Sequence, residues 1–433
     1  MPPPRTIHIG IFDYDASLRA RRLSGRHAEA AIAGDFAFPN VLYRWDTGES
    51  VYDFTEQFGA EPCTIDRDSR RTYPFEADAA LYIADYAGPS RSLSPREVLK
   101  RQIARADAMG FAARSAFECE FTVLNETAES LRDKHWARPT AWAPDNRCWS
   151  ADSAGTYAEF VTSLEDVIAS LGIPLYGLGT ELGPGCIEAT LEADTPLKSA
   201  DDYALFRTFT KSYCRRRGLT ASFLAQLGEG FQGLSGHLHL SLADKATGRP
   251  LFHDASSPDG MSQTMKHFMA GLLTLLPECA ALCTHTVNAW RRMVPGNWAP
   301  RTPSWDFNNY GVALRVVTTT PDTTRIEFRV PAADTNPHLA LALALGAGLW
   351  GIENKLELPE RATGDVRAFV PRGLRALPRT LLEAAERLEA CAPARDIFGA
   401  EFIDHFVMTR KHEDAVLRRA VSAAERARYL EAI

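Results

Sequence analysis

The sequence predicts an α+β protein in which one large sheet carries the functional side chains. Residues 6–95 contain short segments of period two separated by turn-forming residues, which indicates a small β-rich domain over residues 1–95. From residue 96 onward, segments with the 3.6-residue period of helices alternate with strand-like segments, which predicts a larger domain over residues 96–433. Charged residues occupy one face of several later strands, so we expect the chemistry there.

The elements follow from these patterns in chain order. In the first domain we expect strands at 7–12 (IHIGIF), 49–54 (ESVYDF) and 79–86 (AALYIADY). Ser94 and Pro95 are a cap residue and a proline at the first helical position, and they open a helix through Met109. In the second domain we expect strands at 117–124, 186–192, 219–226, 237–243, 312–318 and 324–330, the last two paired, and helices at 156–172, 202–218, 262–287 and 337–352, followed by a helical tail.

Composition excludes several classes of protein. With 45% apolar and 24% charged residues, the 433-residue chain is globular, and its net charge of −7 argues against a nucleic-acid partner. The N-terminus has no signal-peptide core, and the longest apolar run, Leu339 to Ile352, is too short to span a bilayer. Eight scattered cysteines are typical of reduced thiols, so we expect a cytoplasmic protein without a membrane partner.

Carboxylates alternate with apolar residues in two of the predicted strands. In FECEF, Glu118 and Glu120 share one face, and in RIEFR the charged residues around Glu327 do the same. Several ionised carboxylates on one wall need cations to neutralise them. Six residues have spacings that favour a paired-metal site: Glu118, Glu120, Glu181, Glu188, His237 and Glu327. Mg²⁺ or Mn²⁺ suits this oxygen-rich set with a single imidazole better than zinc does.

The order of the motifs is more specific than any one of them. The chain contains E-x-E, E-x-G-P-G-x-x-E, G-x-x-G-H-x-H-x-S, N-x-x-R-R-x-V-P-G-x-x-A-P, A-L-R and R-I-E-x-R, in that order. Over about residues 90–433 this series resembles the glutamine synthetase superfamily of ATP-dependent carboxylate–amine ligases. The resemblance implies a β-grasp-like N-terminal domain and a catalytic domain with a curved antiparallel sheet flanked by helices.

The resemblance also implies roles for these residues. One ion would be held by Glu120, Glu181 and Glu188, and another by Glu118, His237 and Glu327, with two or three Mg²⁺ or Mn²⁺ ions in a site that also binds ATP. Eleven residues would contact the substrates. On the glutamate and amine side they are Glu120, Gln232, Gly233, His237, Arg292, Arg329 and Tyr310, with Arg292 on the α-carboxylate. On the nucleotide side they are His239, Ser241, Arg315 and Arg325, and the two arginines also act in catalysis.

Three positions depart from the family pattern. Trp298 stands in the flap where glutamine synthetase has a glutamate that helps to deprotonate ammonium, and an indole cannot act as a base. Tyr310 stands where the family has an arginine that steadies the transferring phosphoryl group, and Arg301 is a candidate replacement. Asp46 is the best candidate for the ammonium-binding aspartate. We count Trp298 and Asp46 among the catalytic residues because they occupy the positions of the family's flap glutamate and ammonium-binding aspartate.

These departures lead to a hypothesis about the amine. The acyl substrate is expected to be L-glutamate, activated as γ-glutamyl phosphate, and the second substrate an organic amine that gives a γ-glutamyl amide. Tryptophan at position 298 favours an apolar or aromatic amine, because an indole stacks on such a group and desolvates it. A weakly basic aniline also arrives neutral at pH 7, so it needs less help in losing a proton before attack. Two alternatives stay open: an ammonia-using glutamine synthetase and a catalytically silent relative.

Assembly follows only from the resemblance. Family members form stacked rings, so a homo-oligomer of hexameric rings, a dodecamer, is expected. The neighbour's N-terminal domain would complete each site, which would place Asp46 across an interface.

Overall fold

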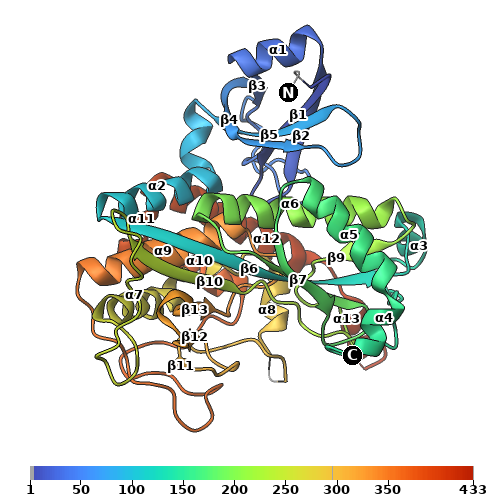
Figure 1. Ribbon diagram of the computed structural model, residues 1–433. Coiled ribbons are helices and arrows are strands. Elements are labelled where there is room, and N and C mark those ends of the chain that lie inside the picture. The colour runs from blue at the N-terminus through green and yellow to red at the C-terminus, as the bar shows by residue number, and fades with distance from the viewer. Residues whose placement is uncertain (1–3, 295, 433) are drawn as a thin grey trace.

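The computed structural model describes residues 4–294 and 296–432, and its strands form two sheets (Figure 1). The smaller sheet has the order β2-β1-β5-β4-β3, and β1 pairs in parallel with β5 and antiparallel with β2. Its elements are β1 (Thr6–Phe12), β2 (Leu18–Ser24), α1 (Arg26–Ala33), β3 (Ala37–Pro39), β4 (Ala60–Thr72) and β5 (Ala79–Tyr86). This arrangement agrees with the β-grasp-like domain that the resemblance implied.

One predicted strand is wrong. Residues 49–54 lie in the loop between β3 and β4, where Val51 forms an isolated bridge with Trp45. Phe54, at the end of this segment, is 87% exposed. A period-two pattern becomes a strand where a neighbouring strand accepts and donates its backbone hydrogen bonds. Within the described residues, this segment exchanges such bonds across the loop only with residues 44–46, at Glu49, Ser50 and Tyr52.

The larger sheet carries the predicted functional residues. Its order is β11-β12-β13-β10-β6-β8-β7, with β9 also paired to β6. Neighbouring strands are antiparallel, except that β11 and β12 run parallel. The strands are β6 (Phe111–Leu124), β7 (Leu175–Thr180), β8 (Cys186–Leu191), β9 (Thr220–Ser222), β10 (Leu238–Asp244), β11 (Trp305–Phe307), β12 (Leu314–Val317) and β13 (Arg325–Phe328). The strand predicted at 219–226 is therefore shorter than expected, whereas the pairing of β12 with β13 is confirmed.

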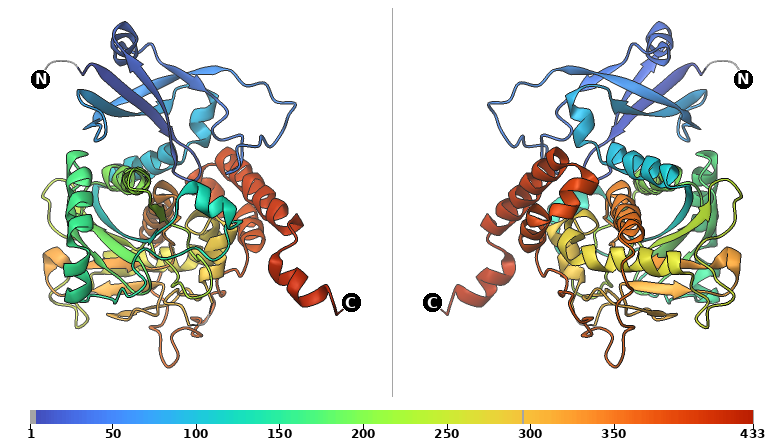
Figure 2. Two further views of the ribbon diagram at one scale, coloured as in Figure 1. Left: turned by 90° about the vertical axis from the view of Figure 1, so that its right-hand side faces the viewer. Right: turned by 90° about the vertical axis from the view of Figure 1, so that its left-hand side faces the viewer.

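Helices cover the face of the larger sheet opposite to its carboxylates. Helices α2 (Pro95–Ala108) and α6 (Pro196–Arg215) pack on β6, and α9 (Pro337–Glu353) packs on both of them and on α7 (Gln263–Cys279) (Figure 1). The remaining helices are η1 (Pro89–Leu93), α3 (Ala128–Asp133), α4 (Ala151–Thr156), α5 (Ala158–Ser170), η2 (Ala280–Leu282), α8 (Val287–Arg292), η3 (Pro321–Thr323), α10 (Leu381–Ala390), α11 (Ala392–Phe398), α12 (Ala400–Arg419) and α13 (Ala423–Tyr429). In both views of Figure 2, α13 projects away from the rest of the chain.

The predicted helix starts at Pro95 and Pro337 are confirmed by their caps, whereas the helix predicted from residue 202 begins six residues earlier, at Pro196. Ser94 accepts a hydrogen bond from the backbone of Glu97, and the Asn336 side chain accepts from the first turn of α9. Helix α9 is apolar and buried along most of its length, as a core helix should be. None of the described helices is long and apolar enough to cross a membrane.

Ion pairs join the two sheets through α2. The guanidinium of Arg96 is almost completely buried and lies 2.6 Å from Asp66 of β4, 2.6 Å from Asp85 of β5 and 2.9 Å from Asp201 of α6. Breaking a buried pair is costly, so these contacts hold the smaller sheet on the larger unit. The domain boundary between residues 95 and 96, at the first residue of α2, stays a prediction.

Candidate active site

Strand register brings the predicted metal ligands to one face of the larger sheet. Glu118 and Glu120 are two residues apart on β6, so they share a face, while Cys119 between them is completely buried on the other. Glu120 lies directly opposite Glu188 of β8, and the backbone N–H of Glu118 donates to the carbonyl of His237 at 2.9 Å. His237 immediately precedes β10, which lies between β6 and β13.

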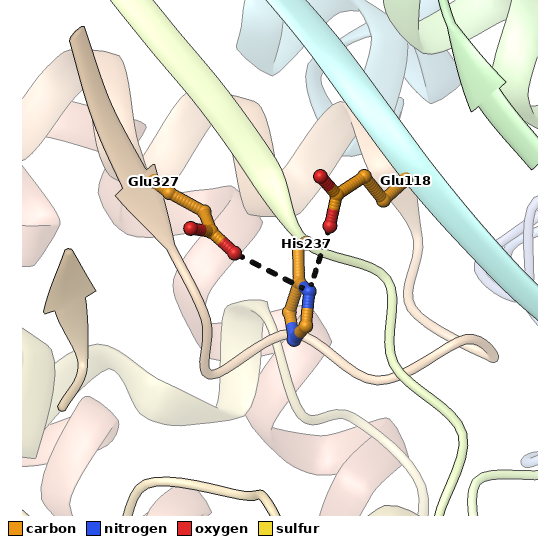
Figure 3. Close-up of side chains that lie close together, drawn as sticks. All are labelled: Glu118, His237 and Glu327. Carbon is orange, nitrogen blue, oxygen red and sulfur yellow. Dashed lines mark hydrogen bonds and ion pairs between the residues drawn. The ribbon is translucent and has the colours of Figure 1, made fainter. Parts of the chain in front are cut away.

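The first cluster consists of Glu118, His237 and Glu327 (Figure 3). Nδ1 of His237 is 3.0 Å from a carboxylate oxygen of Glu118 and 3.5 Å from one of Glu327. One ligand atom from each residue lies within 4.8 Å of the others. Glu327 is completely buried and His237 almost so. Two carboxylates and one imidazole at this spacing fit a hard divalent cation.

Protonation states in this cluster favour cation binding. Burial opposes ionisation of Glu118, but hydrogen bonds with His237 and His239 outweigh it and hold the pKa of Glu118 well below its usual range. Burial, reinforced by the positive charge of Arg329, lowers the pKa of His237 to about 4. The imidazole is therefore neutral at pH 7, which is the form that binds metals.

We call the second predicted ligand set, Glu120, Glu181 and Glu188, the second cluster; its members come from β6, the β7–β8 turn and β8. Among the described residues, only the first cluster is a group of three with ligand atoms that all lie within 4.8 Å of one another, so the second cluster stays a prediction. Burial raises the pKa of Glu120 to about 7, against a hydrogen bond from the backbone of Ser235 at 2.6 Å. Burial and then the neighbouring carboxylates, Glu118 first, raise the pKa of Glu188 to about 9. Crowded carboxylates retain protons where no positive group balances their negative charges. A divalent cation bound among them supplies that positive charge.

These shifts predict proton release on cation binding. Because the Glu188 carboxyl keeps its proton at pH 7 in the cation-free protein, a bound Mn²⁺ must displace it, and we expect release of about one proton per chain. The apparent affinity should rise by up to about tenfold per pH unit between pH 7 and pH 9. Calorimetry in buffers of different ionisation enthalpy measures this release.

The matched variants separate this site from the rest of the surface. Glu188→Gln should lose most of the proton release. Glu192 is exposed and lies just beyond β8, so the Glu192→Gln variant should keep the proton release. Mn²⁺ binding that is independent of pH in the unaltered protein would contradict the prediction.

Arginines surround Glu327. Arg315 of β12 lies opposite Glu327 in the register, and both Arg315 and Arg329 form ion pairs with its carboxylate. Arg325 donates to Nδ1 of His239 at 3.0 Å, and Nε2 of this histidine lies 2.9 Å from Glu118. The predicted nucleotide-side residues are thus connected to the first cluster.

Arg292 lies at the end of α8 and is almost completely buried. Its guanidinium donates to the carbonyl of Val330 at 3.0 Å and to the hydroxyl of Ser235 at 2.9 Å. A Cβ atom at Gly233 would lie 2.8 Å from Cγ of Arg292, so glycine is required for the backbone to pass this close. Burial lowers the pKa of Arg292 to about 10, which leaves the group charged at pH 7.

Four further predicted residues have the following positions. Ser241 is on β10, two residues beyond His239. Gln232 packs close to Gly183 in the turn that follows Glu181. Trp298 is 55% exposed, with the guanidinium of Arg367 6.0 Å from its ring centroid, and Tyr310 is 50% exposed.

Asp46 is not brought to the clusters within the chain. It lies in the β3–β4 loop, where its carboxylate accepts from the backbone of Ser50 at 2.9 Å and lies 3.4 Å from His412 of α12. Its predicted place across a subunit interface stays a prediction.

Sequence reasoning missed two residues of the site. Ser235 binds both Glu120 and Arg292, and its position inside the motif G-x-x-G-H was a usable signal. Cys148 donates from Sγ to a carboxylate oxygen of Glu181 at 3.2 Å. No local pattern marks Cys148, because it lies on a loop 33 residues before its partner.

The fold and the side chains on one face of the larger sheet indicate an enzyme with a candidate site for a hard divalent cation. Residues 92–429 match the family model for the glutamine synthetase catalytic domain, and the chain belongs to this family. The family resemblance and the predicted fold are thereby confirmed. Enzymes of this family use ATP and divalent metal ions and act on small molecules.

Known relatives include proteins named as a glutamine synthetase, a glutamate–isopropylamine ligase and a gamma-glutamylethanolamide synthetase. Type-1 glutamine synthetase 2 of Dictyostelium discoideum is 36% identical, with 99% of this chain and 84% of the relative covered. Glutamate–isopropylamine ligase of a Pseudomonas species is 30% identical, with 99% and 95% covered. Gamma-glutamylethanolamide synthetase GlnA4 of Streptomyces coelicolor is 33% identical, with 84% and 76% covered.

The overall fold is also shared with a solved structure. A GmaS–ADP complex has a TM-score of 0.85 at 24% identity and covers 99% of this chain and 97% of its own. This likeness concerns the fold.

Proposed function

We propose that this protein is an ATP-dependent ligase that joins the γ-carboxyl group of L-glutamate to an organic amine. The observation that supports it best is the cluster of Glu118, His237 and Glu327 together with the half-exposed indole of Trp298. The cluster suits phosphoryl transfer from ATP, and the indole suits an amine other than ammonia. The relatives that ligate isopropylamine or form glutamylethanolamide support the same reading.

The chain's own residues bind and orient the reactants. Mg²⁺ or Mn²⁺ ions held by Glu118, His237 and Glu327 and by Glu120, Glu181 and Glu188 would neutralise the charges of ATP and glutamate. Arg315 and Arg325 bind the phosphates as planar forks, with His239 and Ser241 on the nucleotide side. Arg292 binds the glutamate α-carboxylate beside the backbone of Gly233, and Arg329 lies on the side of the reacting carboxyl group.

Two bond exchanges complete the reaction. The γ-carboxylate oxygen of glutamate bonds to the terminal phosphorus of ATP, and the bond from that phosphorus to ADP breaks. The amine nitrogen then bonds to the acyl carbon, inorganic phosphate leaves, and the nitrogen loses a proton. Since Trp298 accepts no proton, an amine that arrives uncharged needs the least assistance from the flap.

The quaternary structure belongs to the same proposal. Stacked hexameric rings would bring Asp46 of one chain to the site of its neighbour, and the exposed side chain of Phe54 on the same loop supports a contact there. Light scattering on the purified protein measures the molar mass, and a stable monomer would contradict the assembly.

An amine panel tests the function. The protein is incubated with ATP, Mg²⁺ and L-glutamate plus isopropylamine, aniline, ethanolamine, putrescine or ammonium, and phosphate release and γ-glutamyl product masses are recorded. We expect product with an apolar or aromatic amine and much less with ammonium. Equal rates with ammonium would favour the ammonia-using alternative, which the Dictyostelium relative represents. No product with any amine would favour the silent relative.

A further inference from the structure

Tyr310 contacts both arginines that are bound to Glu327. The guanidinium carbon of Arg315 lies 4.7 Å from the centroid of the Tyr310 ring, and that of Arg329 lies 5.1 Å from it. The backbone carbonyl of Tyr310 also accepts a hydrogen bond from Nε of Arg329 at 3.1 Å. One residue therefore touches a charged group on β12 and another that immediately follows β13.

The aromatic ring, rather than the phenol hydroxyl, makes these contacts. Within residues 4–294 and 296–432, the Tyr310 hydroxyl forms no hydrogen bond, and the side chain is 50% exposed. The face of an aromatic ring carries partial negative charge and attracts cations within about 6 Å of its centroid. Both guanidinium groups satisfy this distance.

Two guanidinium groups share one carboxylate here. Glu327 is completely buried and forms ion pairs with both Arg315 and Arg329. The ring face of Tyr310 adds a second attraction to the same two guanidinium groups. An arginine at position 310 would instead place a third like charge beside them.

We propose that Tyr310 is a positioning residue that sets the places of Arg315 and Arg329 through its ring face. The role in catalysis rests on the proposed ligase function, since these arginines bind the anionic substrates there. A tyrosine at this position does not supply the positive charge of the family arginine. Its ring instead holds the guanidinium groups of Arg315 and Arg329 in place. Restoring arginine at position 310 should consequently impair the site.

The first measurement is independent of ligation. Phenylglyoxal modifies accessible arginines, and peptide mass spectrometry reports the rates at Arg315 and Arg329 separately. Tyr310→Phe keeps the ring and should stay within about twofold of the unaltered protein, whereas Tyr310→Leu should speed modification of Arg315 by about 3- to 30-fold. Tyr310→Met is a second variant without a ring, and thermal unfolding checks that each variant is folded.

The matched control lies outside the site. Tyr429 on α13 is 48% exposed and has the guanidinium of Arg428 5.9 Å from its ring. Tyr429→Leu should leave the modification of Arg315 and Arg329 unchanged. Any common effect of removing an exposed tyrosine is therefore visible in this variant.

The second measurement uses turnover of the full-length protein. Tyr310→Leu should raise KM for ATP and glutamate by about 3- to 30-fold with a smaller change in kcat. Tyr310→Phe should be less impaired than Tyr310→Leu, and Tyr310→Arg should be worse than Tyr310→Phe. Three results would each overturn the proposal. They are Tyr310→Phe being as impaired as Tyr310→Leu, arginine labelling that is unchanged in the variants without a ring, and recovery of activity in Tyr310→Arg. If the labelling rates were as expected but the unaltered protein catalysed no ligation, only the proposed function would be overturned.

Discussion

Glu327→Gln is expected to abolish ligation and to remove cation binding at the cluster of Glu118, His237 and Glu327. The side chain is completely buried and forms ion pairs with Arg315 and Arg329. A neutral amide leaves the buried guanidinium of Arg329 and the partly buried guanidinium of Arg315 without their carboxylate. Removal of one partner from a buried pair costs about 3–5 kcal/mol. Loss of about 10³-fold or more in turnover is the expected magnitude.

Two measurements separate cation binding from folding. Mn²⁺ binding followed by electron paramagnetic resonance should fall by at least one site per chain, and thermal unfolding should move to lower temperature. Glu192 is exposed and lies just beyond β8, so the Glu192→Gln variant should change neither the Mn²⁺ stoichiometry nor the unfolding temperature. If Glu327→Gln bound Mn²⁺ with full stoichiometry and unchanged affinity, the assignment of Glu327 as a ligand would be wrong.

Trp298→Glu is expected to move the preference from an organic amine toward ammonium. The side chain is 55% exposed, so the substitution leaves the core intact. A carboxylate in the flap accepts the proton that ammonium must lose before attack, and a positioned base contributes about 10²- to 10⁴-fold. We expect the ratio of kcat/KM for ammonium to that for the best organic amine to rise by about 100-fold.

Two controls isolate the effect of the base. Trp298→Phe keeps an apolar ring and should retain the preference for the organic amine, while Trp298→Gln has similar size to glutamate without its basicity and should lose the organic amine without gaining ammonium. A Trp298→Glu variant that loses both substrates equally would show that the indole only packs the flap.

The sequence predicted much of the metal site because strand geometry is local. In FECEF and RIEFR the period of two places alternate residues on one face, and this required no knowledge of which strands are neighbours. The proximity of Glu118, His237 and Glu327 is confirmed by their geometry. The ligand roles and the second cluster stay predictions, although Glu120 and Glu188 do face each other across β6 and β8.

Other features were beyond sequence reasoning because they depend on distant contacts. The pairing of Arg315 and Arg329 with one carboxylate requires β12 and β13 to be in a particular register. Cys148 reaches Glu181 from a loop, and the segment at 49–54 has the pattern of a strand but no neighbour for most of its backbone.

The sequence by itself determined which chemical groups are present, their order and the face of the strand on which each lies, because these follow from backbone periodicity. Only the tertiary structure decided how their charges are shared. Burial and neighbouring carboxylates raise the pKa of Glu188, whereas hydrogen bonds with two imidazoles hold that of Glu118 low, although both are glutamates on paired strands. Electrostatic interactions act between groups close in space whatever their separation along the chain, so these differences appear only when the sheet is assembled.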